Sequence, residues 1–131
     1  MAAIGIEQLK KLPAFNEKRQ DNAKGLDQDL KGLKGVTTPY VPEGMKHVYH
    51  QYTIRAQKRD DLKAHLEKDF IRAGIYYPRL ITENAPLRPF VKAPMPVANQ
   101  AVKEVLSLPI HPALSQDDIG RIITSIKKFY T

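Results

Sequence analysis

Ten prolines are distributed along the 131 residues, and they limit how long any helix or strand of this chain can be. Proline has no backbone N–H, and inside a helix its ring clashes with the preceding turn, so it ends or bends regular structure. Pro13 interrupts an apolar N-terminal pattern, Pro39 and Pro42 punctuate a loop, and four prolines crowd residues 86–96. These prolines therefore predict a stop or bend of the first helix at Pro13 and irregular loops at 36–46 and 86–96.

The clearest strand spans residues 47–56, where side chains alternate between two faces. Its presumed buried face carries Val48, His50, Tyr52, Ile54 and Ala56. Helices are predicted at 2–12, 14–33, about 60–70, 97–105 and 116–130, with short strands at 36–38, 73–77 and 106–110. This order predicts an α+β fold, in which a small sheet of three or four short strands is covered by helices.

A long N-terminal helix is predicted over residues 1–34, stopped or bent near Pro13. Apolar residues recur at helical spacing on both sides of this proline. Gly35 is a natural terminator, because glycine readily adopts the left-handed conformation that ends helices. The remaining residues, 35–131, are predicted to form a small domain of their own.

The last helix is the best specified of these elements. Ser115 can accept hydrogen bonds from the unpaired N–H groups of the first turn. Asp117 and Asp118 lie in that turn, and Lys127 and Lys128 in the last one, where their charges complement the helix dipole. The apolar stripe consists of Ile119, Ile122, Ile123, Ile126 and Tyr130.

The formal net charge of +7 raises the question of an anionic partner, nucleic acid included. The lysines and arginines are spread along the whole chain and never form a run of five like charges. This distribution is typical of a solvated basic surface and argues against nucleic-acid binding.

The absence of cysteine excludes disulfides, thiolate metal sites and cysteine nucleophiles. No apolar run approaches the roughly 20 residues that a membrane-spanning helix needs. The first twelve residues lack the features of a signal or transit peptide. We therefore expect a cytoplasmic protein without a membrane segment.

No stand-alone catalytic signature occurs, neither a glycine-rich phosphate loop nor a nucleophile elbow. His47 and His50 lie three apart on the predicted strand, hence on opposite faces, so they cannot easily share a metal ion. His65 has no second ligand at a suitable helical spacing. His111 precedes Pro112, and we interpret it as part of a rigid turn. We predict no catalytic and no metal-binding residue in this chain.

Two places in the sequence are candidates for ligand contacts. His50 lies on the presumed buried face, where an imidazole needs a hydrogen-bond partner; it is either structural or at the edge of a substrate cleft. Tyr76, Tyr77 and Pro78 end a predicted strand, and Arg79 follows. An arginine can bind phosphate or carboxylate through two parallel hydrogen bonds, but the pattern fits a solvated arginine beside an aromatic core edge equally well.

Four segments, in order along the chain, resemble the C-terminal part of DegT/DnrJ/StrS aminotransferases. AAIGIEQLKKL (2–12) is similar to the segment that opens the long helix linking their large and small domains. HVYHQYTIR (47–55), followed by RDDLKAHL, resembles their small-domain strand and helix. GIYYPRL (74–80) resembles their tyrosine–proline strand end. EVLSLPIHPALSQDDI (104–119) is similar to their closing motif, in which two proline turns lead into the last helix.

The resemblance implies the small domain of a fold type I aminotransferase that depends on pyridoxal phosphate. Such enzymes move an amino group, usually from glutamate or glutamine, onto a keto-sugar attached to a nucleotide. In this family the Schiff-base lysine and the acidic partner of the pyridine nitrogen belong to the large domain. We therefore expect the cofactor only in the complete enzyme, none bound to this chain, and no activity without a large cofactor-binding domain or partner chain.

For the substrate side, the resemblance points to Tyr76, Tyr77, Pro78 and Arg79 as a wall, with His50 as a further candidate. Many family members carry a histidine shortly after the tyrosine–proline, near the sugar nucleotide. This chain reads RLITEN there, with Thr82 about where that histidine would fall, so the resemblance does not carry this contact over.

A helix that normally packs on a large domain would leave Ile4, Ile6 and Leu9 uncovered, which predicts a homo-oligomer for the chain by itself. The residues leave one alternative open, an independent basic module with a regulatory or nucleic-acid-binding role. That alternative predicts salt-sensitive binding to nucleic acid.

Overall fold

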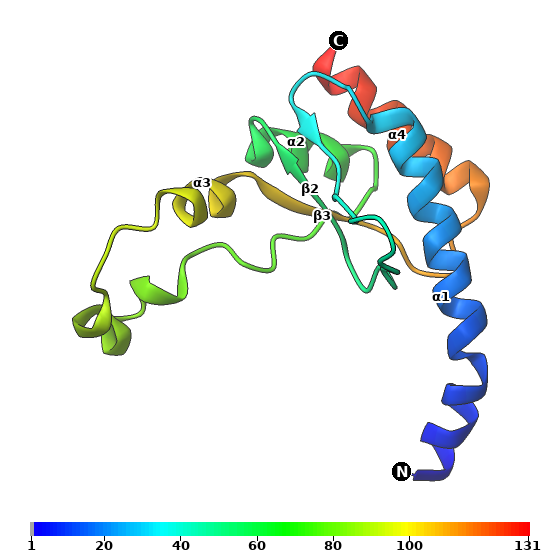
Figure 1. Ribbon diagram of the computed structural model, residues 1–131. Coiled ribbons are helices and arrows are strands. Elements are labelled where there is room, and N and C mark those ends of the chain that lie inside the picture. The colour runs from blue at the N-terminus through cyan, green and yellow to red at the C-terminus, as the bar shows by residue number, and fades with distance from the viewer. Residues whose placement is uncertain (1) are drawn as a thin grey trace.

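A three-stranded antiparallel sheet forms the centre of the molecule, in the order β1-β2-β3. The structure, a computed structural model, describes residues 2–131. The elements are α1 (Ala2–Leu30), β1 (Val36–Thr37), β2 (Tyr52–Ala56), α2 (Arg59–Lys68), η1 (Ile81–Glu83), η2 (Ala85–Phe90), α3 (Pro96–Glu104), β3 (Val105–Leu108) and α4 (Gln116–Tyr130), with η marking 3-10 helices. The predicted α+β class is thereby confirmed, with its small sheet and its long N-terminal helix (Figure 1).

The pairing of the strands fixes which side chains share the core. In β2, Tyr52 lies opposite Leu108 and Ile54 lies opposite Leu106, and all four are buried. The predicted strand at 73–77 is wrong except at one residue. Gly74 alone pairs with the outer edge of β3, through two 2.8 Å hydrogen bonds between its backbone N–H and C=O and those of Ser107.

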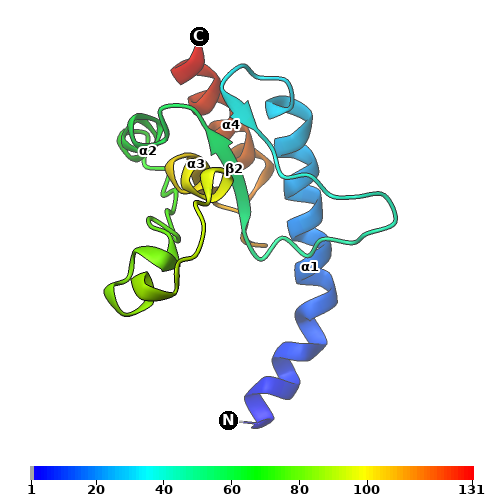
Figure 2. The same ribbon diagram turned by 60° about the vertical axis from the view of Figure 1, so that its left-hand side comes forward.

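The helices α1 and α4 lie side by side against one face of the sheet, and α2 packs on α4 (Figures 1 and 2). An ion pair between Asp29 and Lys127 joins α1 to α4. Leu26 and Leu30 of α1 meet the isoleucine stripe of α4 in the core, as the helical spacing predicts. The fully buried large side chains are Asn22, Leu26, Leu30, Tyr52, Ile54, Leu62, Leu66, Leu106 and Ile126.

Of the two outcomes predicted at Pro13, a stop or a bend, the stop is wrong, because α1 is continuous from Ala2 to Leu30. Residues 2–15 are all exposed, so water can hydrogen-bond the carbonyl that the proline leaves without a helical partner. The helix ends slightly earlier than predicted, and Gly32 adopts the left-handed conformation with φ of 87°. None of the helices in residues 2–131 is both long and apolar enough to cross a membrane.

The predicted strand at 47–56 is correct only from Tyr52 onward. Tyr49 adopts a left-handed φ of 46°, and its N–H donates a 2.8 Å hydrogen bond to Nδ1 of His47. This turn breaks the alternation, so Tyr49 is buried while Val48 and His50 are exposed. The expectation of a buried His50 is therefore wrong.

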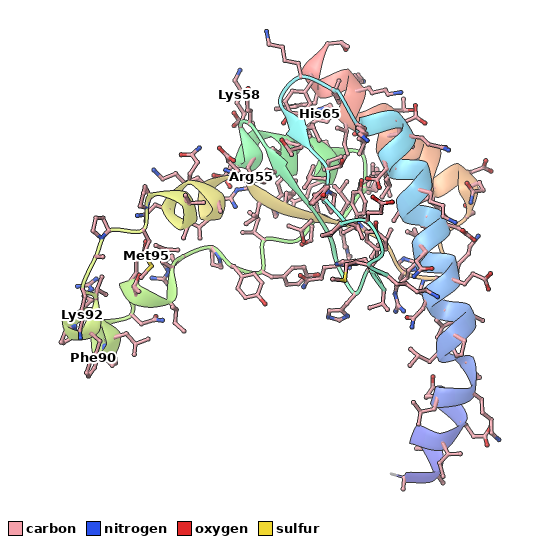
Figure 3. The ribbon with its side chains drawn as sticks, viewed as in Figure 1. Arg55, Lys58, His65, Phe90, Lys92 and Met95 are labelled. Carbon is pink, nitrogen blue, oxygen red and sulfur yellow. The ribbon has the colours of Figure 1, made fainter. Side chains whose placement is uncertain are left out.

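Residues 76–104, which we call the arm, project from the sheet and contain no buried residue (Figure 1). The irregular loop predicted at 86–96 is partly ordered, because η2 occupies Ala85–Phe90. Phe90, Lys92 and Met95 lie at the far end of the arm, away from the sheet (Figure 3). The apolar spacing at 97–105 predicts burial of Ala98, Ala101, Val102 and Val105, but all four side chains are only half-buried.

The prediction that Phe70 belongs to the apolar side of the second helix is also wrong. The helical spacing of Leu62 and Leu66 extends to Phe70, but α2 ends at Lys68. Phe70 itself has a φ of 60° and is 90% exposed. The left-handed turn carries its ring away from the core, and Ile71 is buried instead.

Candidate functional site

A cavity of about 580 Å³ lies at the end of the sheet where β2 begins and β3 ends. We call it the arginine cavity, because Arg19 of α1, Arg72 after α2 and Arg121 of α4 all line it. His50 and His111 add two imidazoles, and the arm contributes Tyr76. The topology thus brings together side chains from the whole length of the chain.

The predicted substrate-side residues do not all meet at this place. His50 and Tyr76 line the arginine cavity, whereas Tyr77 lines a neighbouring cavity of about 260 Å³. Pro78 and Arg79 are exposed and line neither cavity. Tyr76 and Tyr77 are 61% and 70% exposed, so neither forms a core edge.

Tyr76 is the wall between the two cavities, since it lines both. Its ring lies against Gly74, where a Cβ would stand 2.8 Å from two ring atoms. Ser107, the bridge partner of Gly74, also lines both cavities and exchanges a 2.8 Å side-chain hydrogen bond with Thr53. The smaller cavity is bounded on the arm side by Ala98, Ala101 and Val102, among others. It is therefore a more apolar neighbour of the arginine cavity.

Asp118 is the single carboxylate in the lining of the arginine cavity. It accepts hydrogen bonds from the Ser115 N–H (2.9 Å) and hydroxyl (2.7 Å), and its own N–H is 3.1 Å from that hydroxyl. The Ser115 hydroxyl and N–H hold the pKa of Asp118 below its ordinary value, with Arg121 and His111 adding to the effect. Asp118 is thus ionised and engaged in capping α4, as the predicted N-cap at Ser115 requires.

The three arginines were not identified as a group from the sequence. They lie far apart along the chain, among other basic residues that look equally solvated. Only the packing of α1 against α4, and the path of the chain after α2, gather them. No local motif could have indicated the cluster.

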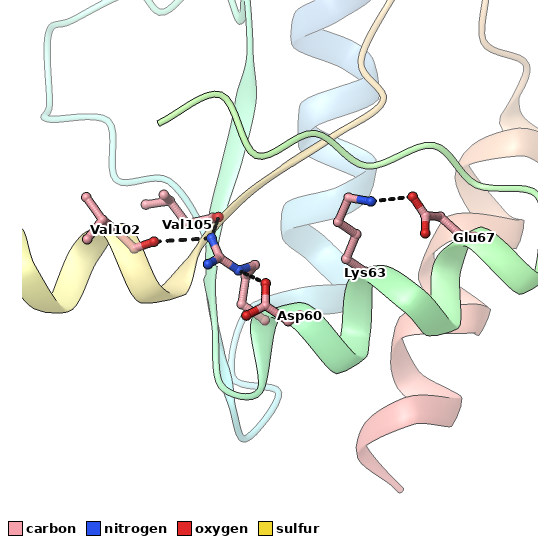
Figure 4. Close-up of polar contacts among 6 residues, drawn as sticks. Asp60, Lys63, Glu67, Val102 and Val105 are labelled. Carbon is pink, nitrogen blue, oxygen red and sulfur yellow. Dashed lines mark hydrogen bonds and ion pairs between the residues drawn. The ribbon is translucent and has the colours of Figure 1, made fainter. Parts of the chain in front are cut away.

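A buried arginine fastens the arm to the rest of the molecule. Arg59 is only 9% exposed, and its Nη1 donates to the carbonyls of Val102 (3.2 Å) and Val105 (3.1 Å), at the end of α3 (Figure 4). Its Nε lies 2.6 Å from a carboxylate oxygen of Asp60, an ion pair that lacks the alignment of a hydrogen bond. A second contact joins β2 to the arm: Arg55 forms a 2.7 Å ion pair with Glu104, the last residue of α3.

The lining residues do not fit a metal or a cofactor held through a lysine. Within residues 2–131, no group of three histidine, aspartate or glutamate side chains is placed to hold a metal ion. No lysine lines the arginine cavity, so no residue there can form a Schiff base with pyridoxal phosphate. What this cavity offers is positive charge, two imidazoles and the aromatic rings of Phe70 and Tyr76.

Comparisons with known proteins give a consistent result. The family model described as the DegT/DnrJ/EryC1/StrS aminotransferase family matches residues 1–127. A protein of Acidithiobacillus ferrooxidans named UDP-N-acetyl-3-dehydro-alpha-D-glucosamine 3-aminotransferase is 35% identical over 89% of this chain and 31% of its own length. The "Pleiotropic regulatory protein" of Geobacillus stearothermophilus is also 35% identical, over 98% of this chain and 36% of its own.

Among solved structures, that of S. venezuelae DesV in complex with a ketimine intermediate matches with a TM-score of 0.91 and 28% identity. The match covers 98% of this chain and 35% of DesV. The chain therefore spans about a third of the length of the relatives it matches.

Proposed function

Because the chain belongs to the DegT/DnrJ/EryC1/StrS aminotransferase family, we propose that it forms the small-domain part of an enzyme that aminates a keto-sugar attached to a nucleotide. The observation that carries this proposal is the match over nearly the whole chain, in sequence to a relative named as a nucleotide-sugar aminotransferase and in fold to DesV with its ketimine intermediate. The nucleotide in the name of the Acidithiobacillus relative supports the substrate class.

In this proposal the chain binds and orients substrate, and the reactive amine comes from elsewhere. Pyridoxal phosphate, bound in the complete enzyme, supplies the electron sink for moving the amino group. The lysine-free lining of the arginine cavity supports a Schiff-base lysine in a large domain or partner chain. The chain by itself is then inactive and binds no cofactor.

In this proposal Tyr76, Tyr77, Pro78 and Arg79 form the substrate wall, and His50 is a further contact; of these, Tyr76 and His50 line the arginine cavity and Tyr77 lines the smaller one. Their exposure supports this role, because side chains that wait for a ligand must be accessible in its absence. Tyr76 has the best-defined position, and we assign it the central place in the wall.

The uncovered apolar surface of α1 supports a partner. Ile4, Ile6 and Leu9 are 64%, 57% and 65% exposed. A helix end with this surface packs either on a large domain or on another copy of the chain, so we propose that the isolated chain forms homo-oligomers. The proposed location is the cytoplasm, where nucleotide-linked sugars are made.

A two-part experiment tests the proposal. Pyridoxal phosphate is titrated into the pure chain, and absorbance is followed for a stoichiometric Schiff base. We expect only slow, random modification of lysines. The chain is then produced together with the large domain of a family relative and assayed for transfer of an amino group from glutamate to a nucleotide-linked keto-sugar. We expect activity only from the combination.

Two results would contradict the proposal. A specific Schiff base, with turnover by the chain alone, would show a complete enzyme. Salt-sensitive binding to nucleic acid, together with inactivity of the combination, would favour a regulatory module instead.

A further inference from the structure

The three arginines of the arginine cavity have little to bind within the protein itself. The side chains of Arg19 and Arg72 form no hydrogen bond or ion pair with any other residue in the range 2–131. Arg121 reaches only the Asp69 carbonyl, at the long distance of 3.5 Å. Other arginines, such as Arg55 and Arg59, are paired. The donors that line this cavity are therefore available to a ligand.

The charge of the lining is unbalanced. The only carboxylate, Asp118, already accepts two hydrogen bonds from Ser115. Like charges gathered around a concave surface repel one another, and the potential of such a surface attracts anions. Asp118 and Asp69 offset part of the charge of Arg121, whereas Arg19 and Arg72 form no ion pair within residues 2–131, so a bound anion would relieve the repulsion that remains.

The volume and the aromatic wall of the arginine cavity also restrict which ligand fits. A volume of about 580 Å³ lies in the range of pockets for small organic ligands and exceeds the needs of a single small anion. One wall is the ring of Tyr76, held against Gly74, and the more apolar cavity lies beyond it. A flat ring attached to the anionic group can pack against Tyr76 at this wall.

We propose that the arginine cavity binds the diphosphate group of a phosphorylated small molecule through Arg19, Arg72 and Arg121. Guanidinium groups bind phosphate oxygens through paired hydrogen bonds, and three of them, from α1, the segment after α2 and α4, match the several oxygens of a diphosphate. Tyr76 packs against the ring that the diphosphate carries. That this ring is a nucleoside rests on the proposed function.

Titration calorimetry of the chain with inorganic pyrophosphate, uridine diphosphate and succinate tests this site. We expect one pyrophosphate per chain, tighter binding of uridine diphosphate, and much weaker binding of succinate. Binding should weaken as salt rises, because the contacts are electrostatic. The variants R19Q, R72Q and R121Q should each lose about tenfold or more in affinity for pyrophosphate, as expected for one charge-assisted contact.

The matched control is R88Q, which removes the same charge from the exposed arm outside the cavity. Thermal melting without ligand checks that each variant is folded, and R72K should keep more affinity than R72Q. If R88Q lost as much affinity for pyrophosphate as the cavity variants do, the proposed site would be wrong. The same conclusion would follow if R19Q, R72Q and R121Q bound pyrophosphate as tightly as the parent.

Two further results separate this inference from the proposed function. Equal affinities for pyrophosphate and uridine diphosphate would refute the packing of a nucleoside on Tyr76. Failure of the aminotransferase assay with intact pyrophosphate binding would refute the proposed function and leave the anion site standing.

Discussion

Tyr76 lies across Gly74 so closely that a Cβ on residue 74 would stand 2.8 Å from two ring atoms of the tyrosine. Gly74 is also the residue whose backbone N–H and C=O bridge to Ser107 of β3. The glycine thus combines two functions, since it holds the start of the arm to the sheet and leaves room for the ring that separates the two cavities.

The substitution G74A should move Tyr76 without unfolding the protein. The clash involves the far end of a side chain that is 61% exposed, so the ring can swing outward at a cost of about 1 kcal/mol or less. We expect a changed chemical environment of the Tyr76 ring, measured by NMR, with a small shift in melting temperature. In the control G5A, an added Cβ meets nothing within 4 Å, and the Tyr76 signals should not move.

The fold was predictable where local chemistry and packing agree. In α4, the Ser115 cap, the charges at both ends and the isoleucine stripe all indicate one helix, and the structure has it at Gln116–Tyr130. Around β2, the same alternation that correctly places Tyr52 and Ile54 fails at His50. The cause is a hydrogen bond between His47 and the Tyr49 N–H, whose turn no periodicity reveals.

The candidate site was predictable only where neighbours in sequence are neighbours in space. Tyr76 and Tyr77 are adjacent, and each lines a cavity. Arg19, Arg72 and Arg121 become neighbours through helix packing alone. A charge count of the sequence cannot distinguish these arginines from solvated ones, because their shared position depends on the tertiary fold.

Replacing Tyr52 with phenylalanine should lower the free energy of unfolding and make that free energy fall less as the pH rises. The Tyr52 hydroxyl donates a 2.5 Å hydrogen bond to Asp27, and its loss should cost about 1 to 3 kcal/mol. Burial, together with the hydrogen bond to Asp27 and its charge, raises the pKa of Tyr52 far above its ordinary value.

A raised phenol pKa contributes stability that is complete below about pH 10, the ordinary value, and is lost as the pH rises toward the folded-state pKa. Urea unfolding at pH 8 and pH 11 should therefore show a smaller alkaline loss for Y52F than for the parent. Tyr130, whose pKa burial raises to about 12, contributes a remaining loss in both proteins. Y40F is the control, because Tyr40 is 85% exposed. An unchanged alkaline loss in Y52F would contradict the assignment.

Removing the cap of α4 with S115A should lower stability by about 1 kcal/mol, since the Ser115 hydroxyl and the Asp118 side chain form a reciprocal capping box. The pKa of Asp118 should rise toward its ordinary value, because Ser115 supplies the hydrogen bonds that lower it. A lowered carboxyl pKa contributes stability above about pH 4 that is lost as the pH falls through the folded-state pKa, so S115A should lose less stability on acidification. NMR titration of Asp118 checks this, with T124A as a solvent-exposed control on the same helix.

Arg59 should be the residue that holds the arm in position. In R59M, similar volume is kept, but the Val102 and Val105 carbonyls lose their donor, which should cost about 1 to 3 kcal/mol. We expect faster hydrogen exchange in α3 and, because α3 borders the smaller cavity, broadened Tyr77 signals. The control R55M breaks a more exposed ion pair with Glu104, which is worth well under about 1 kcal/mol. If R55M loosened α3 as much as R59M does, the surface ion pair rather than the buried guanidinium would be the attachment of the arm.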